Sequence, residues 1–353
     1  MSQPQTKFTI GVSRQLLNED LTAVIPEFDF TPLLENPAIE LTTLAAVGGG
    51  DLRSADVEHL DAVILFLERV TSDTVSSSSR TAVFARYGVG FDTLDVEACN
   101  QAGIAIAIAP AGVCRPVATT VIALMLALSL NLRKKDELVR SGGASWAGKS
   151  ELNGMGLVGR TLGIVGLGNI GAEVARLAAP FDMNLIAHDP FISAETAAAV
   201  GVKLVSLQEV FTESDVLSLN CPLSPETTGL VDARHLSLMK PTSYLINTAR
   251  GPVVDEQALI EALQGGVIAG AGLDVFEKEP PDDDNPLLSM PQVILSPHAL
   301  CFTDQCMAGL GAADVEACLG VMSGTAPRNL ANPAVLDSPE FKKRMDALRQ
   351  RFA

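Results

Sequence analysis

The segment that decides the fold is TLGIVGLGNIG, residues 161–171, in which an apolar run leads directly into the pattern G-x-G-x-x-G. Thr161–Val165 has the length and composition of a buried strand, and a helical pattern of apolar residues follows Gly171. In this setting Gly166 allows a tight turn, Gly168 lets the backbone approach a pyrophosphate, and Gly171 lets the helix pack closely on the strand. The segment therefore predicts a dinucleotide site at a helix N-terminus. The alternative is an ordinary glycine turn in another α/β sheet.

An acidic residue follows the motif at the distance that a dinucleotide site requires. Asp189 lies eighteen residues after Gly171, at the end of the apolar run 184–188. A carboxylate at this point can accept both ribose hydroxyls of NAD, and it would repel the 2′-phosphate of NADP. No arginine in residues 190–193 offsets that repulsion. NAD is therefore the predicted cofactor; the alternative is a surface aspartate in a turn before proline.

Apolar runs on both sides of the motif repeat the same rhythm. Runs of β-forming residues alternate with helix-length segments, which is typical of parallel sheets covered by helices on both faces. The expected strands are 8–12, 62–67, 81–86, 104–108, 161–165, 184–188, 202–205, 215–219, 244–247, 270–275 and 292–295. The predicted fold class is doubly wound α/β.

The length of the chain and the place of the motif predict a domain plan. At 353 residues the chain is long enough for two domains, and the glycine motif does not begin it. We expect two doubly wound, Rossmann-like domains with parallel sheets. An NAD-binding domain, residues 113–298, is inserted into a discontinuous substrate domain, residues 1–112 and 299–353. A helix beginning at Val117 is expected to enter the NAD-binding domain.

Composition and charge exclude several classes of partner. The formal net charge of -17 disfavours nucleic acid and anionic membranes, although local arginines could still bind an anionic substrate. Residues 1–9 contain no apolar segment of signal-peptide length, and the apolar run 117–130 is interpreted as a buried core helix. The six cysteines show neither a disulfide framework nor metal-ligand spacing. A cytoplasmic protein without a metal site is expected.

Three further segments carry a family resemblance. They are LSLMKPTSYLINTARG, residues 236–251; GLDVFEKEP, residues 272–280; and LSPH, residues 295–298. These segments resemble the signatures of the D-isomer-specific 2-hydroxyacid dehydrogenases, which include phosphoglycerate, glycerate and formate dehydrogenases. The resemblance extends from Arg86 to about Pro333 and implies an enzyme that transfers a hydride between NAD(H) and a D-2-hydroxy acid or 2-keto acid.

The resemblance assigns the catalytic roles to Arg250, Glu279 and His298. Arg250 would hold the substrate carboxylate and polarise the neighbouring carbonyl, because its guanidinium is a fixed, forked charge. His298 would carry the proton, with Glu279 hydrogen-bonded to the far nitrogen of its ring. Taken singly, each has an ordinary interpretation: a surface arginine, a solvated carboxylate in an acidic stretch, and a structural histidine. A glutamine in place of this glutamate marks the formate dehydrogenases, so that branch is disfavoured.

The resemblance also implies binding residues. Cofactor contacts are expected from Gly166, Gly168, Asn169, Ile170, Gly171, Asp189, Pro222, Thr227, Thr248 and Asp274. Substrate contacts are expected from the backbone amides of Val89 and Gly90, from Arg250 and from Arg69, for which a surface arginine is an equal alternative. Departures from the family pattern leave open the role of Arg115, and Leu300, Cys301 and Phe302 are expected to shape an unusual pocket.

A second class of function shares this fold. Corepressors that sense NAD retain the same three catalytic residues, so the alternative to an enzyme is a dinucleotide-sensing binding protein. Turnover of NADH with 2-keto acids separates the two. By family resemblance a homodimer is expected, and no regulatory domain is expected after Pro333, because residues 338–352 predict one short charged helix.

Overall fold

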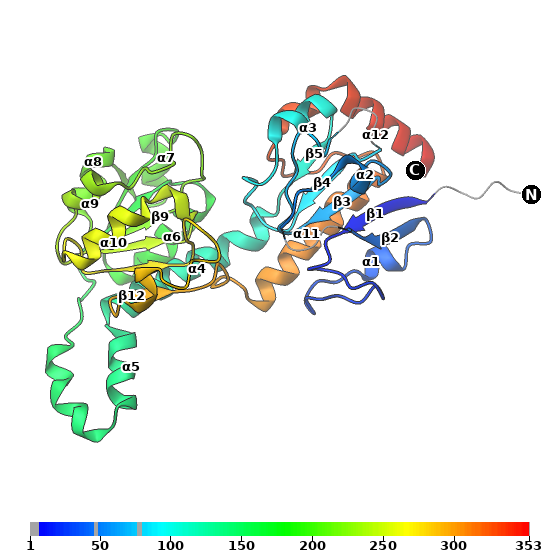
Figure 1. Ribbon diagram of the computed structural model, residues 1–353. Coiled ribbons are helices and arrows are strands. Elements are labelled where there is room, and N and C mark those ends of the chain that lie inside the picture. The colour runs from blue at the N-terminus through cyan, green and yellow to red at the C-terminus, as the bar shows by residue number, and fades with distance from the viewer. Residues whose placement is uncertain (1–6, 46–48, 76–79, 353) are drawn as a thin grey trace, which may run out of the picture. The chain divides into compact units, whose positions relative to one another are not determined.

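The computed structural model describes residues 7–45, 49–75 and 80–352. The chain forms two compact units: unit 1 comprises Met1–Val113 with Phe302–Ala353, and unit 2 comprises Cys114–Cys301 (Figure 1). Along the chain, unit 2 is therefore an insertion into unit 1. Residues 1–6, on which the expectation of a cytoplasmic location partly rests, lie outside the described residues.

Unit 2 is built on a parallel sheet of seven strands. The strands are β6 (Thr161–Val165), β7 (Asn184–His188), β8 (Lys203–Leu204), β9 (Val216–Leu219), β10 (Tyr244–Asn247), β11 (Gly270–Leu273) and β12 (Val293–Leu295). Their order is β12-β11-β10-β9-β6-β7-β8, and all neighbouring pairs are parallel. The strand order reverses between β6 and β9, and sheets of this kind bind ligands beyond the carboxyl ends of the strands at such a point.

Helices cover both faces of this sheet. They are α4 (Pro110–Ser129, shared with unit 1), α6 (Asn169–Ala178), α7 (Ala194–Ala199), α8 (Leu207–Glu213), α9 (Ala233–Leu238) and α10 (Glu256–Gln264). Helix α5 (Leu132–Arg140), which follows α4, has no buried residue. On β6, Leu162 and Ile164 face a buried cluster formed with α4 and α6. Val165 faces the opposite cluster, formed with α8 and α10. Burial on both faces explains why the strands appear in the sequence as continuous apolar runs.

Unit 1 repeats the architecture on a smaller scale. Its strands are β1 (Phe8–Val12), β2 (Ile39–Thr43), β3 (Ala62–Leu65), β4 (Val83–Arg86) and β5 (Ala105–Ala107), and its helices are α1 (Thr31–Leu34), α2 (Ser54–Val57), α3 (Val96–Ala102), α11 (Asp304–Met322) and α12 (Pro339–Phe352). The parallel strand order is β2-β1-β3-β4-β5, which places the reversal between β1 and β3. Two helix-flanked parallel sheets confirm the predicted fold class.

Two elements differ from the expectations. Strand β2 was not predicted, because it is an edge strand in which only Ile39 is buried and charged Glu40 interrupts the apolar pattern. Helix α4 begins at Pro110 rather than Val117 and contains Pro116 in its interior. Proline is favoured in the first turn of a helix, and here Pro110 takes that position.

Helix α4 is long and apolar enough, by length and composition alone, to cross a membrane. Half of its most apolar stretch is buried within the protein. Its side chains Ala118, Val121, Leu124 and Met125 belong to the core cluster on one face of the sheet in unit 2. This packing is that of a core helix.

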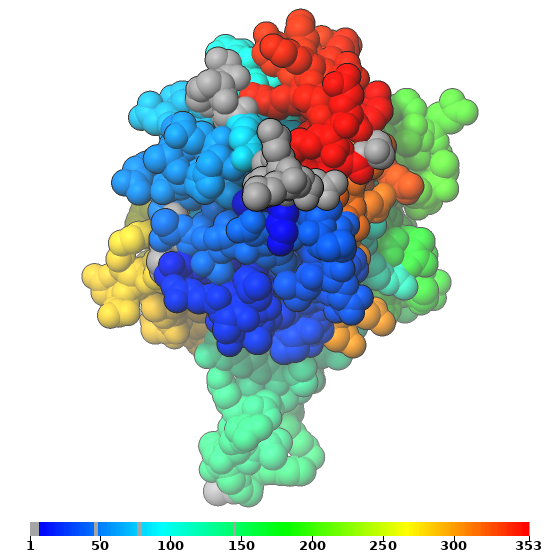
Figure 2. Space-filling view, turned by 90° about the vertical axis from the view of Figure 1, so that its right-hand side faces the viewer, coloured from blue at the N-terminus to red at the C-terminus, as the bar shows by residue number. Residues whose placement is uncertain are grey.

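The carboxyl-terminal segment completes unit 1. Asn332 accepts a hydrogen bond from the Ile106 amide at 2.7 Å and donates to the Ile104 carbonyl at 2.9 Å, which fixes the segment beside β5. In the last turn of α12, the Arg351 guanidinium lies 3.2 Å from the buried carboxylate of Asp61. Figure 2 shows this helix, in red, against the blue amino-terminal part of the same unit. The charged helix expected at the end of the chain is therefore part of the fold.

Candidate active site

The glycine loop after β6 has a distinct reason for each glycine. Gly166 has φ +89°, and a Cβ there would lie 2.8 Å from the Cys221 amide nitrogen after β9. A Cβ at Gly171 would overlap the Gly166 carbonyl, so this glycine brings α6 against the turn. At Gly168, which caps α6, a Cβ would meet no atom within 4 Å. The open space in front of the helix N-terminus is where a phosphate would lie.

Asp189 is held at the carboxyl end of β7, beside this loop. Its Oδ2 accepts a hydrogen bond from the Leu167 amide at 2.8 Å, and its Oδ1 accepts one from the Phe191 amide at 2.9 Å. The carboxylate is thereby fixed next to the second residue of the motif. This is the place where a carboxylate contacts the ribose of a dinucleotide.

A buried hydroxyl also fits a dinucleotide. Thr248 directly follows β10, and its Oγ1 is buried without a hydrogen-bond partner among the described residues. A buried hydroxyl without a partner is costly unless a ligand or water satisfies it. Together with the open space at Gly168, Thr248 gives this edge of the sheet the features that a bound NAD would need.

The turn that carries Arg250 is fixed by two neighbours. Buried Asn247 donates from Nδ2 to the Arg250 carbonyl at 2.9 Å and accepts from the Ala249 amide at 3.0 Å. Gly251 lies so close to the Phe276 carbonyl that a Cβ would overlap it. These contacts bring the turn after β10 against the segment that leads from Phe276 to Glu279. No pattern in the sequence assigns this positioning role to Asn247 or Gly251.

Glu279 and His298 form a hydrogen-bonded pair. The His298 Nδ1 lies 2.9 Å from Glu279 Oε2, and Glu279 Oε1 accepts from the Phe276 amide at 3.1 Å. Burial raises the pKa of Glu279, but the hydrogen bond and charge of His298, the Phe276 amide and the charge of Arg250 together lower it below its ordinary value. Glu279 is therefore an ionised carboxylate hydrogen-bonded to the imidazole, and the side chains of Glu279 and His298 are 38% and 43% exposed.

The backbone around His298 is held from the sheet. His298 has φ +54°, a conformation that residues other than glycine seldom adopt. Buried Asp274, directly after β11, accepts from the amides of Ala299 and Leu300, each at 3.1 Å. Asp274 thus binds the backbone of the turn that directly follows His298, a contact that the sequence did not predict.

Nearly all of unit 2 matches a family model. Residues 122–299, half of the chain, match the NAD-binding domain of the D-isomer specific 2-hydroxyacid dehydrogenases. The chain is also 34% identical over 319 residues to glyoxylate reductase of Korarchaeum cryptofilum, covering 90% of this chain and 96% of that protein. The chain belongs to the D-isomer specific 2-hydroxyacid dehydrogenase family. Unit 2 is its NAD-binding domain.

Other relatives of this family member differ in length or specificity. It is 35% identical over 294 residues to D-3-phosphoglycerate dehydrogenase of Archaeoglobus fulgidus, covering 83% of this chain and 55% of that protein. The chain thus spans about half the length of this relative, as it does for the enzyme of the same name from Methanocaldococcus jannaschii. The solved D-lactate dehydrogenase of Aquifex aeolicus, in complex with NAD and lactic acid, has a TM-score of 0.78 at 27% identity. The match covers 91% of this chain and 98% of the D-lactate dehydrogenase chain.

The remaining residues expected to contact NAD in this family member lie in two places. Asn169 and Ile170 form the first turn of α6. Pro222 and Thr227 lie in the loop after β9, where Thr227 Oγ1 donates to the Pro222 carbonyl at 2.7 Å. Both sets follow the strands that flank the reversal of strand order. Arg115, whose role was open, forms an ion pair with Glu173 on α6.

The residues expected to bind substrate in unit 1 lie beyond the carboxyl ends of β3 and β4. Val89 and Gly90 follow β4, and the preceding Gly88 has φ +142°. Arg69 follows β3, but its Nε lies 3.2 Å from Asp51 Oδ1 and both side chains are exposed. The structure therefore gives Arg69 an exposed ion-pair partner, Asp51.

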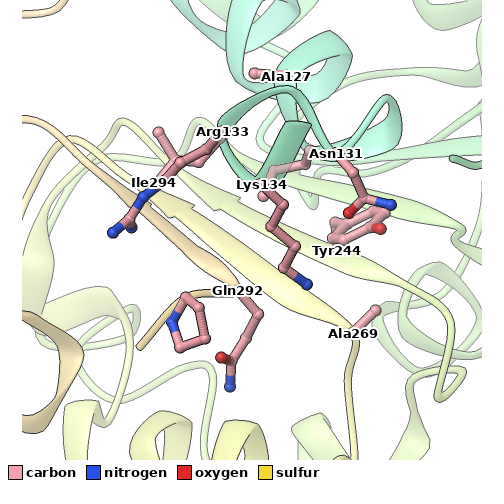
Figure 3. Close-up of a pocket in the computed structure, with 10 residues that line it drawn as sticks. Ala127, Asn131, Arg133, Lys134, Tyr244, Ala269, Gln292 and Ile294 are labelled. Atoms are coloured by element: carbon pink, nitrogen blue, oxygen red, sulfur yellow. The ribbon is translucent and has the colours of Figure 1, made fainter. Parts of the chain in front are cut away.

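A small pocket in unit 2 is separate from the NAD site. Figure 3 shows it between the end of α4 and the amino ends of β10 and β12, with Asn131, Arg133, Lys134, Tyr244 and Gln292 around it. Its volume of about 20 Å³ leaves room for little more than one water molecule. The glycine loop follows the carboxyl end of β6, and the strands are parallel, so this pocket lies at the opposite edge of the sheet.

Proposed function

We propose that the protein interconverts a D-2-hydroxy acid and the corresponding 2-keto acid with NAD(H). The observation that carries the proposal is the pair of Glu279 and His298 at 2.9 Å, with the charge of Arg250 acting on the same carboxylate. All three residues stand in the unit that contains the glycine loop. An acid, a base and a carboxylate-binding cation are the groups that this reaction requires from a protein.

The proposed mechanism follows from the geometry of the pair. Because Nδ1 of His298 faces Glu279, the proton exchanged with substrate is carried at Nε2. In keto-acid reduction Nε2 donates this proton to the carbonyl oxygen, and in hydroxy-acid oxidation it accepts the hydroxyl proton. Arg250 holds the substrate carboxylate and polarises the carbonyl. NAD supplies the hydride chemistry when bound. In unit 1 we assign the amides of Val89 and Gly90, with Arg69 as a further candidate, to substrate binding.

A keto-acid assay with NADH tests the proposal. Purified protein is mixed with NADH and a panel of 2-keto acids, and the loss of NADH absorbance is followed. We expect turnover that His298→Ala reduces at least a thousandfold, about 4 kcal/mol, while NADH affinity stays within twofold. NADH binding without turnover of any 2-keto acid would favour the dinucleotide-sensing alternative. The relatives described above are all named as dehydrogenases or reductases, which supports the enzyme.

We also propose that two copies associate through α5 and the segment that follows it. Helix α5 has no buried residue, and it extends from the body of unit 2 in Figure 1. Apolar Leu132, Val139 and Trp146 are exposed there. Exposed apolar groups on a projecting element are typical of an interface. Sedimentation should show a dimer that Leu132→Glu with Val139→Glu converts to a monomer, whereas Leu34→Glu in unit 1 should leave it intact.

A cytoplasmic location is proposed with the same function. A reducing compartment suits a protein with six cysteines and an NAD-linked reaction. Fractionation of the source cells tests this proposal, because recovery with the membranes or outside the cell would contradict it.

A further inference from the structure

A pocket of about 570 Å³ lies at the carboxyl ends of β1 and β3 in unit 1. It occupies the reversal of strand order in the five-stranded sheet, where ligands of doubly wound folds bind. Its size lies within the range of about 300–1,000 Å³ that is typical of small-molecule sites. The lining residues are Gln15, Val24, Ile25, Pro26, Glu27, Phe66, Phe302, Thr303, Asp304 and Met307.

One wall of the pocket is the end of a column of aromatic rings. Phe28 stacks on Phe30 and on Tyr87, with ring centroids 3.9 and 5.4 Å apart, and Phe66 meets Tyr87 edge-to-face at 5.6 Å. Phe28, Phe30 and Tyr87 are fully buried, so Phe66 presents a supported ring to the pocket. Gly311 of α11 permits this packing, because a Cβ there would lie 2.8 Å from the Phe28 ring.

The loop that carries Phe66 is fixed before any ligand arrives. Buried Glu68 accepts from Ser13 Oγ at 2.5 Å and from the Phe66 amide at 2.9 Å, which ties the loop after β3 to the loop after β1. Two other lining residues leave apolar surface open: the side chains of Val24 and Phe302 are 43% and 47% exposed. An aromatic wall together with exposed apolar side chains is typical of a site for an apolar ligand group.

The pocket adjoins the loop to which the substrate carboxylate is assigned. Tyr87, which packs on Phe66, directly precedes Gly88, Val89 and Gly90. Its hydroxyl donates to the carbonyl of Met307, a lining residue, at 3.0 Å. In a 2-keto acid the side chain begins on the carbon next to the carbonyl, so a carboxylate at Val89 and Gly90 leaves the side chain within reach of Phe66.

The charges around the pocket disfavour an anionic side chain. None of the ten lining residues is basic, and Glu27 and Asp304 are acidic. The amino end of α11 is already capped, because Thr303 and Asp304 accept from the amides of Cys306 and Gln305. A phosphate or a second carboxylate would therefore meet negative charge without a cation among the lining residues to compensate for it.

We propose that the preferred substrate is a 2-keto acid, or the matching D-2-hydroxy acid, with a bulky apolar side chain, branched or aromatic, that fills this pocket. The proposal rests on the dehydrogenase function proposed above. It differs from the activities named for the glyoxylate reductases and the phosphoglycerate dehydrogenases among the relatives, since glyoxylate has no side chain and phosphoglycerate carries a phosphate.

A substrate panel tests the proposal with the wild-type protein. The specificity constants kcat/KM for NADH-dependent reduction are measured with phenylpyruvate, 4-methyl-2-oxopentanoate, glyoxylate and 3-phosphohydroxypyruvate. We expect the first two to exceed the last two at least tenfold. A preference for glyoxylate or 3-phosphohydroxypyruvate would overturn this proposal and leave the dehydrogenase function standing. Absence of turnover with every compound would instead overturn the dehydrogenase function.

Charge variants localise the effect. Val24→Lys places an ammonium at the pocket on an exposed side chain and should lower kcat/KM for phenylpyruvate at least tenfold, while glyoxylate changes less than threefold. Leu34→Lys is the matched control, because Leu34 is 45% exposed in the same unit but does not line the pocket, and it should leave both values unchanged. Phe302→Ala should reproduce the selective loss. Equal effects of Val24→Lys on both substrates, or none on either, would overturn the proposal.

Discussion

The two sheets offer ligands different chemistry at equivalent places. At the reversal of the seven-stranded sheet, Gly166, Gly168 and Gly171 expose main chain and the first amides of α6. At the reversal of the five-stranded sheet, side chains such as Phe66 and Phe302 line a pocket. One architecture therefore presents mainly backbone at the first place and mainly side chains at the second. Ligand binding at the first place should be lost when a Cβ is added to a glycine. Ligand binding at the second should change when a lining side chain is replaced.

The largest effect is expected from a Cβ added at Gly171. It would overlap the Gly166 carbonyl, so Gly171→Ala should lower the free energy of unfolding by about 3 kcal/mol and abolish measurable NADH binding. Gly168→Ala is the matched control. Its Cβ meets no protein atom, so stability should be unchanged while NADH affinity falls at least tenfold. Urea unfolding and NADH titration measure both quantities. Equal stabilities of the two variants would show that backbone packing does not define this site.

Arg250→Lys tests substrate binding in unit 2, which we assign to a side chain and not to the backbone. The charge survives, but an ammonium cannot form two parallel hydrogen bonds to a carboxylate and a carbonyl. We expect kcat/KM to fall at least 100-fold, about 2.7 kcal/mol, with NADH affinity unchanged. Steady-state kinetics measure kcat/KM for this variant and for the control Arg234→Lys, in which an exposed arginine is replaced. Near-normal kinetics would mean that another cation, with Arg69 the first candidate, holds the substrate carboxylate.

Asp189→Ala tests the one property of the NAD site that we assign to a side chain, the preference for NADH over NADPH. The wild-type protein should prefer NADH to NADPH at least tenfold in kcat/KM, about 1.4 kcal/mol, because the carboxylate repels the 2′-phosphate. The substitution should narrow this preference, whereas Glu195→Ala, an exposed carboxylate in the same unit, should not. Equal use of NADH and NADPH by the unmodified protein would contradict the role of Asp189.

Glu279→Gln should produce the smallest change, a shift in pH dependence. The pKa of Glu279 is lowered against the effect of burial, chiefly by its hydrogen bond with His298, so at neutral pH an ionised carboxylate lies 2.9 Å from Nδ1 of the ring. Reduction needs the protonated ring, and oxidation needs the neutral ring. Without the carboxylate charge at position 279, the alkaline limb of reduction and the acid limb of oxidation should both move to lower pH. Profiles of kcat/KM that coincide with those of the wild-type protein would show that the pair is not coupled.

Much of unit 2 was predictable from local sequence. Short segments of sequence were enough to predict the glycine motif, the place of Asp189 and the strands. The strands were predictable because burial on both faces of the sheet leaves an unbroken apolar run. The His298–Glu279 pair followed from the family resemblance, and its hydrogen bond is present in the structure. The edge strand β2 was missed because it buries only one residue.

Other features depend on contacts that are distant in sequence. Asn247 and Gly251 act on the Arg250 turn through backbone geometry, which no pattern of side chains records. The pocket in unit 1 joins residues from three separate segments, 15–27, 66 and 302–307, and only Phe302 had been singled out. The Asp274 contacts with Ala299 and Leu300 likewise required the fold. Topology, rather than composition, brings these groups together.

The place of the last helix has a consequence for the chain as it leaves the ribosome. Every strand of unit 2 has been made once residue 301 emerges, whereas Tyr87 is separated from Met307 by 220 residues, Ile106 from Asn332 by 226, and Asp61 from Arg351 by 290. Unit 2 can therefore finish folding first. Until α11 and α12 have been synthesised, the strands of unit 1 that precede the insertion lack the helices that cover their apolar residues. We therefore expect the strands of unit 1 that precede the insertion to become native after unit 2.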